Sequence, residues 1–384
     1  MNSARFSFGT KHNVFAHKDI PTKGAPCIKW LSLLRARLLL QRFMSACSRG
    51  AISTVFLLMA IQMNAQTLLS GAGASFPSPI YSKWIGEYQK IHPEVQIKYQ
   101  PIGSAAGIFE LTGGTVDFGA SDRPMNDSQL ENFRINHKME ILHFPSVLGA
   151  DVPIYNLPGI TVELKFTPEV LAGIFLGKIS KWNDPLLTKT NPDANLPDQN
   201  IRVVFRTDGS GTTYVWTDYL AKVSEEWRTQ IGFGTSVGWP AGIGTDGNEG
   251  VSVLVKQTPY SIGYLELTYA LKLKLTYGSV KNKAGNYVKA DLDSVWAAAE
   301  LSEGRPTDFR LSITDAPGEK AYPISSFNWL LVPERFADKN KSKAMKDFLE
   351  WILTDGQKLA QALQYVPLPN EIVAKEHQAL AKVQ

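Results

Sequence analysis

The chain has 384 residues, of which 44% are hydrophobic and 20% charged, an ordinary globular composition with enough length for two or more domains. Nine of its 40 basic residues and one of its 36 acidic residues lie in residues 1–66, which leaves 31 basic and 35 acidic residues in 67–384. This body therefore carries a net charge of −4, which excludes a global electrostatic attraction to nucleic acid or to an anionic membrane.

The N-terminal segment has the layout of a secretory signal peptide. Residues 51–63 form an apolar run that follows Arg49 and is too short for a membrane span of ~20 residues. We expect cleavage near Ala65. The preceding 43 residues fit a signal peptide poorly, so we expect translation to begin at Met44, and a retained N-terminal anchor is the alternative. Both cysteines, Cys27 and Cys47, lie in this segment, so the body has no disulfide or thiol chemistry.

From residue 67 onward, strand-like and helix-like segments alternate. Strands are predicted at 95–101, 116–122, 141–157, 201–207 and 261–270. Helices are predicted at 77–91, 104–114 and 212–227, after Thr167 as N-cap, and near 345–353, while 183–200 reads as a surface loop. Such alternation predicts an α/β fold with mainly parallel sheets.

Three turns rich in glycine and serine lie beside predicted helices, at 70–77, 103–107 and 206–213. A helix N-terminus offers unpaired N–H donors and the positive end of a dipole, and glycine lets a backbone approach a ligand closely. Three such ends that converge would surround a tetrahedral oxyanion. Each turn alone is also consistent with an ordinary connection to a capped helix.

The third turn carries Arg206 and Asp208, a more specific signal. An arginine fork binds an oxyanion with two parallel hydrogen bonds, and a carboxylate two residues later orients the fork. The alternative is a surface ion pair, which contributes little to stability.

Enzyme signatures are weak in this sequence. Residues 242–247 match G-x-G-x-x-G, but no clear strand precedes them. There is no P-loop, Ser210 has no evident base, and the histidines after residue 66 are scattered. These features argue against a phosphatase or a nucleotide-binding enzyme. The tryptophans at 84, 182, 216, 227 and 239 are interpreted as packing residues rather than as a sugar site.

The order of these segments resembles the PstS family, the periplasmic phosphate-binding proteins of ABC importers. The matching stretches are SGAGASFPSPIYSKW (70–84), PIGSAAG (101–107), TVDFGASDRP (115–124), FLGKISKWNDP (175–185), VVFRTDGSGTTYVWTDYLAKVSEEW (203–227) and KAYPISS (320–326). Similarity runs through essentially all of 67–384.

The resemblance implies a type II periplasmic-binding-protein fold of two hinge-connected α/β lobes, with the ligand in the cleft between them. Lobe I would comprise 67–148 plus 322–384, and lobe II 149–321. Phosphate would be bound by Ser75, the backbone N–H of Phe76, Ser104, Asp122, Arg206, Asp208, Ser210, Gly211 and Thr212.

The same resemblance implies the protein's role and its partners. It would be a monomeric, non-enzymatic periplasmic receptor without cofactor or metal. It would deliver phosphate to a permease of two transmembrane subunits and an ATPase. A binder of another tetrahedral oxyanion, such as arsenate, and a diverged sensor or adhesin are the alternatives.

Asp122 would select the ligand by its protonation state. Phosphate near neutral pH carries a proton and can donate a hydrogen bond to a carboxylate, whereas sulfate carries none and would leave a buried charge unpaired, at a cost of roughly 2–5 kcal/mol. Asp122 is also compatible with a turn before Pro124. The neighbouring Arg123 would weaken this acceptor if its side chain pointed inward.

Overall fold

The computed structural model describes residues 66–300 and 308–384. The expected signal peptide, its cleavage site and the expected start at Met44 lie outside the described residues. No helix within the two described ranges is long and apolar enough to span a membrane.

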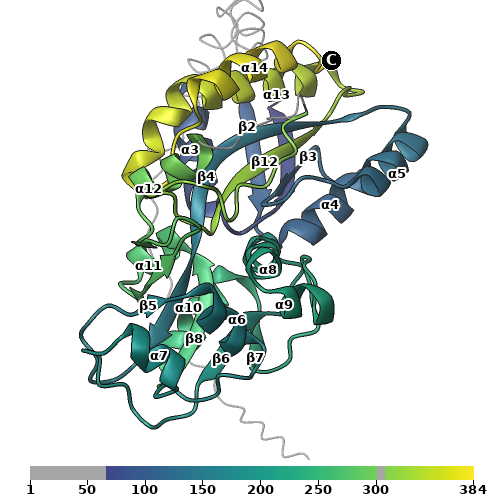
Figure 1. The fold of residues 1–384 in the computed structure, drawn as a ribbon. Coiled ribbons are helices and arrows are strands. Elements are labelled where there is room, and N and C mark those ends of the chain that lie inside the picture. Colours follow the sequence, from purple (N-terminus) through teal and green to yellow (C-terminus); the bar gives the residue numbers. More distant parts are fainter. Residues whose placement is uncertain (1–65, 301–307) are drawn as a thin grey trace, which may run out of the picture. The chain divides into compact units, whose positions relative to one another are not determined.

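Strands and helices alternate along most of the chain (Figure 1). The strands are β1 (Thr67–Gly73), β2 (Val95–Gln100), β3 (Phe118–Ser121), β4 (Ile141–Asn156), β5 (Lys165–Phe166), β6 (Arg202–Arg206), β7 (Ile243–Thr245), β8 (Ser261–Glu266), β9 (Thr276–Tyr277), β10 (Ser279–Lys281), β11 (Tyr287–Val288) and β12 (Ser325–Pro333). The helices are α3 (Ser78–Ile91), α4 (Ser104–Thr112), α5 (Asp127–His137), α6 (Pro168–Phe175), α7 (Pro185–Thr190), α8 (Gly211–Val223), α9 (Glu225–Gln230), α10 (Gly247–Gln257), α11 (Leu267–Lys272), α12 (Leu292–Glu300), α13 (Lys339–Trp351) and α14 (Asn370–Leu380).

Nine of the strands in the described part of the chain form one mixed sheet, in the order β2-β1-β3-β12-β4-β8-β6-β7, with β9 also against β4. The pairs on either side of the centre are parallel, as predicted, but β12 and β4 run antiparallel to their neighbours. The expectation of mainly parallel sheets is therefore wrong at the centre. The reason is that β4 continues from one half of the sheet into the other as one strand, without the crossover helix that parallel pairing requires.

The path of β4 divides the sheet into two halves, and its long ribbon is visible in Figure 1. Residues 141–150 of β4 pair with β12, whereas the stretch from Asp151 to Asn156 pairs with β8. One half is thus built on β1, β2, β3 and β12, and the other on β6, β7 and β8.

Most predicted elements are present, and three differ for a local reason. The helix predicted at 212–227 is divided at Ser224, whose backbone is extended and whose hydroxyl accepts from the N–H of Trp227 to begin α9. The strand predicted at 261–270 ends at Glu266, because this carboxylate caps α11. The predicted loop at 183–200 contains α7, which is capped by Asp184. In each case a side-chain cap outweighs the local pattern.

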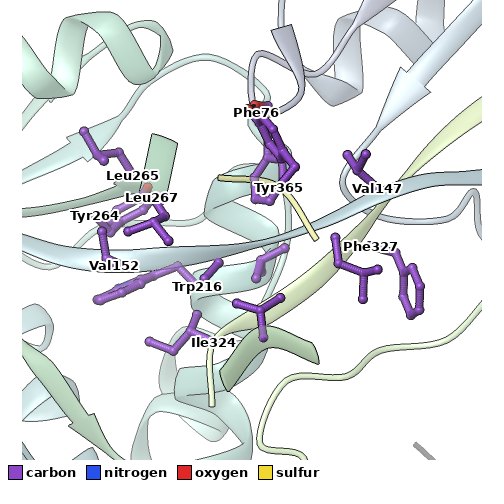
Figure 2. Close-up of a cluster of buried hydrophobic side chains, with 14 of the residues drawn as sticks. Phe76, Val147, Val152, Trp216, Tyr264, Leu265, Leu267, Ile324, Phe327 and Tyr365 are labelled. Carbon is purple, nitrogen blue, oxygen red and sulfur yellow. Dashed lines mark hydrogen bonds between the residues drawn. The ribbon is translucent and has the colours of Figure 1, made fainter. Parts of the chain in front are cut away.

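The core confirms the packing interpretation for four of the five tryptophans, since Trp84, Trp182, Trp216 and Trp227 are fully buried, whereas Trp239 is half-buried against the core. Figure 2 shows part of this core, with Val147 and Val152 from β4 and the rings of Phe76 and Tyr365 side by side. Their ring centroids are 6.3 Å apart. The core therefore reaches directly to the turn after β1, which carries the first of the candidate site residues.

Candidate anion-binding site

The nine candidate residues lie at the ends of strands and the starts of helices. Ser75 and Phe76 follow β1, Ser104 begins α4, Asp122 follows β3, Arg206 ends β6, Asp208 and Ser210 form the next turn, and Gly211 and Thr212 begin α8. All are buried except Asp208, which is half-buried. Loops normally run over the surface, so this degree of burial indicates that the three turns cover one another.

The first turn is held by two tyrosines from distant parts of the chain. The Tyr269 hydroxyl donates to the backbone oxygen of Ser75 at 2.7 Å, and the Tyr365 hydroxyl donates to that of Phe76 at 2.7 Å. The carbonyl groups are thereby occupied, while the N–H of Phe76 has no partner among the described residues. The predicted backbone donor is available.

The second and third turns touch each other. The N–H of Ala105 donates to the oxygen of Gly209 at 2.9 Å. A Cβ atom placed on Gly211 would lie 2.7 Å from Asp122 Cβ and closer still to Asp122 Oδ2 and Ser104 Oγ. The N-terminus of α8 therefore lies directly against Asp122, and only a glycine at position 211 leaves room for such a close contact.

Arg206 is buried and already partly engaged. Its side chain is 1% exposed, its Nε donates to Asp208 Oδ1 at 2.5 Å, and its Nη2 donates to Asp208 Oδ2. The predicted pairing is present, but it is an interior pair and not a surface one. Burial raises the pKa of Asp208, yet the hydrogen bonds from Arg206 outweigh this effect and hold that pKa below its usual value.

Arg206 also binds a residue that the sequence analysis missed. Its Nη1 donates to Asn248 Oδ1 at 3.1 Å, and Asn248 Nδ2 lies 3.4 Å from Ser75 Oγ. Asn248 is fully buried in the first turn of α10. Three of the five N–H donors of Arg206 are thus used, and the other two have no partner among the described residues.

The sequence carries one signal for Asn248, the glycine motif at 242–247. No strand precedes this motif, as expected, but the short strand β7 lies inside it, because Ile243 to Thr245 pair with β6. Strand, glycine and helix therefore follow one another here as they do in the other three turns.

Asp122 combines a satisfied oxygen with an unsatisfied one. Its Oδ1 accepts from Asn328 Nδ2 at 2.7 Å, whereas its buried Oδ2 has no hydrogen-bond partner among the described residues. Burial raises the pKa of Asp122 to about 7, against the lowering effect of the Asn328 hydrogen bond. A buried acceptor without a donor is costly, so Oδ2 is suited to a ligand that brings its own proton.

Arg123 does not point at Asp122. Its Nη1 donates to the oxygen of Pro124 at 2.9 Å and to Gln129 Oε1 at 3.0 Å, and its guanidinium carbon lies 5.8 Å from the ring centroid of Tyr214. The side chain is held beside the helix cap of α5, and the weakening of Asp122 considered from the sequence does not arise.

A cavity lies beside Arg123 and is separate from the candidate residues. This cavity of about 720 Å³ is lined by residues such as Arg123, Tyr214, Phe233 and Arg310 and includes none of the nine. Within residues 66–300 and 308–384, no group of histidine, cysteine, aspartate and glutamate side chains could hold a metal ion. The donors described above suit a small anion: N–H groups, hydroxyls and one guanidinium.

Comparisons with known proteins agree with this geometry. A family model described as a PBP superfamily domain matches residues 60–356. The phosphate-binding protein PstS of Pasteurella multocida is 43% identical over 326 residues, covering 84% of this chain and 92% of the relative. The phosphate-binding protein PstS of Xylella fastidiosa (strain Temecula1) is 46% identical over 307 residues, covering 79% and 82%.

A solved structure shares the fold. PfluDING, a high-affinity periplasmic phosphate-binding protein solved with bound phosphate, has a TM-score of 0.67 and 21% identity, and the match covers 81% of this chain and 93% of that one.

Gly211→Ala should disrupt the site without unfolding the protein. The added methyl group collides with Asp122 and Ser104. Overpacking costs about 1–3 kcal/mol, so affinity for phosphate, the anion expected from the sequence, should fall about tenfold to hundredfold. The control is Gly86→Ala on an exposed position of α3, where a Cβ meets nothing within 4 Å. Calorimetric titration of both variants measures the difference, and equal affinities would contradict the geometry.

Asp122→Asn should stabilise the empty protein in a pH-dependent way. The folded-state pKa is raised from 3.8 to about 7, so Asp122 contributes stability that is present at low pH and is lost as pH rises through about 7. The gain of the variant over the wild type should therefore grow from about pH 4 to about pH 8, by up to about 4 kcal/mol at about 1.4 kcal/mol per pH unit. Denaturant unfolding without ligand at both pH values tests this, and a constant difference would disprove it.

Proposed function

Because the chain belongs to the PstS family of phosphate-binding proteins within the PBP superfamily, we propose that it binds inorganic phosphate and delivers it to an ABC-type phosphate importer. The observation that carries this proposal is the buried, unpartnered Oδ2 of Asp122 facing the N-terminus of α8. The proposed ligands are Ser75, Phe76, Ser104, Asp122, Arg206, Asp208, Ser210, Gly211 and Thr212.

The proposed roles of these groups follow from their chemistry. The N–H groups of Phe76 and of the first turn of α8 donate to phosphate oxygens, as do hydroxyls and the remaining N–H groups of Arg206. Asp208 orients Arg206 by the two hydrogen bonds between them. Asp122 accepts a hydrogen bond from the protonated oxygen of phosphate. Sulfate has no such proton and is rejected by the same carboxylate.

We propose that the two halves of the sheet are lobes that close on the ligand. Lobe I comprises 67–148 plus 322–384 and lobe II comprises 149–321. The change of β4 from pairing with β12 to pairing with β8 at Asp151 supports the first crossing. With these bounds, Ser75, Ser104 and Asp122 belong to one lobe, and the Arg206–Thr212 segment belongs to the other. Ligand binding would then stabilise closure by bridging them.

The wider role follows from the family, whose members are periplasmic substrate-binding proteins. We propose a periplasmic, monomeric receptor that is secreted with a cleaved signal peptide and docks on a permease of two transmembrane subunits and an ATPase. We also propose that it is not an enzyme. Ser210 supports this, because its Oγ accepts from the N–H of Thr213 as the helix cap of α8, and no basic or acidic side chain in the described part of the chain hydrogen-bonds to it.

Direct titration tests the main proposal. The full chain, stripped of bound anion, should bind phosphate with a dissociation constant of about 1 μM or tighter, roughly −8 kcal/mol, and should give no heat with sulfate at about pH 8. Arsenate, which carries the same proton, should compete with phosphate. Sulfate binding as tight as phosphate binding would indicate a different oxyanion receptor, and no binding of any of the three would favour a sensor or an adhesin.

Arg206→Ala should weaken phosphate binding by roughly 2–5 kcal/mol, since it removes a buried charge and leaves Asp208 unpaired. The matched control is Arg202→Ala, four residues earlier in β6, whose side chain is exposed. Calorimetry should find the control close to wild type. A wild-type affinity for Arg206→Ala would exclude this residue from the site.

A further inference from the structure

Asn328 connects Asp122 to a small buried network of hydroxyl groups. Asn328 lies on β12, is fully buried, and donates from Nδ2 to Asp122 Oδ1 at 2.7 Å. Its own Oδ1 accepts from the Tyr81 hydroxyl at 2.5 Å and from Ser146 Oγ at 3.0 Å. The two hydroxyls are 2.8 Å apart. The amide therefore has partners on both of its sides.

A β-bulge places Ser146 in this network. Asn328 pairs with Val147 and Trp329 pairs with Pro145, so Ser146 is the extra residue of β4 at this point. Bulges disrupt a ladder locally, and they often re-aim a side chain next to a functional site. Here the bulge is located beside the one amide that contacts Asp122 Oδ1.

The network fixes which way the Asn328 amide faces. In the opposite orientation, the amide oxygen would face the Asp122 carboxylate, acceptor against acceptor, while the NH₂ group would face two hydroxyls. Burial raises the pKa of Tyr81 well above its ordinary value, so its hydroxyl keeps its proton and remains a donor to the amide oxygen. The NH₂ group is consequently held toward Asp122.

We propose that Asn328 is a positioning residue for ligand selection: by occupying Oδ1 of Asp122, it leaves Oδ2 to meet the bound anion and keeps that oxygen an acceptor. This inference rests on the proposed function. The chemical class that such a site takes is a tetrahedral oxyanion that still carries a proton. Without Asn328, Asp122 would hold its own proton at higher pH and donate it, and an unprotonated anion would then be accepted.

Other titratable and charged groups also act on Asp122. They are Tyr81 of α3, Tyr99 of β2, Asp151 of β4, Arg206 with Asp208 of the β6 turn, and Glu266 of β8, while Asp218 and Arg310 line a cavity of about 170 Å³ that reaches Asp122. These groups remain in place when Asn328 alone is changed. A comparison between wild type and variant therefore isolates the amide.

Sulfate is the probe of choice because it does not change its protonation between about pH 6 and about pH 9, so its pH dependence reports the protein alone. In the wild-type full chain, sulfate binding should strengthen only as pH falls below about 7, where Asp122 is protonated. In Asn328→Leu the same gain should begin at higher pH. The preference for phosphate over sulfate at about pH 8 should fall about tenfold to hundredfold.

Two further variants keep the test decisive. Tyr81→Phe leaves Asn328 in place but removes one of its orienting donors, and it should shift the sulfate profile in the same direction by less. Ser326→Ala is the matched control on β12, because its Oγ donates to the backbone oxygens of Phe327, at 2.9 Å, and of Asp122, at 3.4 Å, and not to the Asp122 carboxylate. Its profile should match the wild type.

The outcomes separate this inference from the proposed function. A wild type that fails to bind phosphate refutes the proposed function itself. A wild type that binds phosphate, together with Asn328→Leu and Tyr81→Phe variants whose sulfate profiles are unshifted, overturns the role of Asn328 alone. Sulfate that stays silent at every pH in all of these proteins also overturns it.

Discussion

The buried carboxylate of Asp122 has to be balanced within the same space that receives an anion. An ionised carboxylate in a protein interior costs several kcal/mol unless partners compensate. Here the compensation consists of one amide from β12, the N-terminus of α8 and the nearby Arg206. Because Arg206 is itself paired with Asp208, the site has little net positive charge. Recognition must then depend on oriented N–H and O–H groups, which discriminate between anions by their protons and not by charge alone.

The groups that compensate the charge of Asp122 come from both halves of the sheet. Asp122 and Ser104 come from the half built on β1 and β3, whereas Gly211 and Arg206 come from the half built on β6 and β8. The hydrogen bond from Ala105 to Gly209 joins the same two turns. In the proposed two-lobe arrangement, the full set of hydrogen-bond donors therefore surrounds the ligand only when the two halves approach each other. Ligand binding and lobe closure are then thermodynamically coupled.

The sequence predicted what is local and missed what is distant. The turn that carries Ser210 and Gly211 was recognisable as a possible anion-binding turn, because a strand, glycine residues and a helix follow one another within ten residues. Thr167 was recognisable as an N-cap because Pro168 follows it at the first helical position. Asn328 lies 206 residues from Asp122, and no local pattern marks an asparagine in a buried strand as the partner of a particular carboxylate. The antiparallel pairing at the centre of the sheet was missed because the composition of β4 does not show which distant strands it pairs with, or in which direction.

Two further buried acids explain why Asp122 is the group that responds near neutral pH. Burial raises the pKa of Asp151 and of Glu266 well above the usual values, and each of the two also lies in the field of Asp122. Asp151 has no donor on either oxygen among the described residues, which favours its neutral form. Asp122 alone among these three has a side-chain amide donating to its carboxylate. This hydrogen bond, together with Arg206 and Ser104, offsets part of the effect of burial, so the pKa of Asp122 is raised only to about 7. The Asn328 amide thus helps to distinguish the carboxyl group that faces the ligand from the two other buried acids, and the amide itself adds no charge to the site.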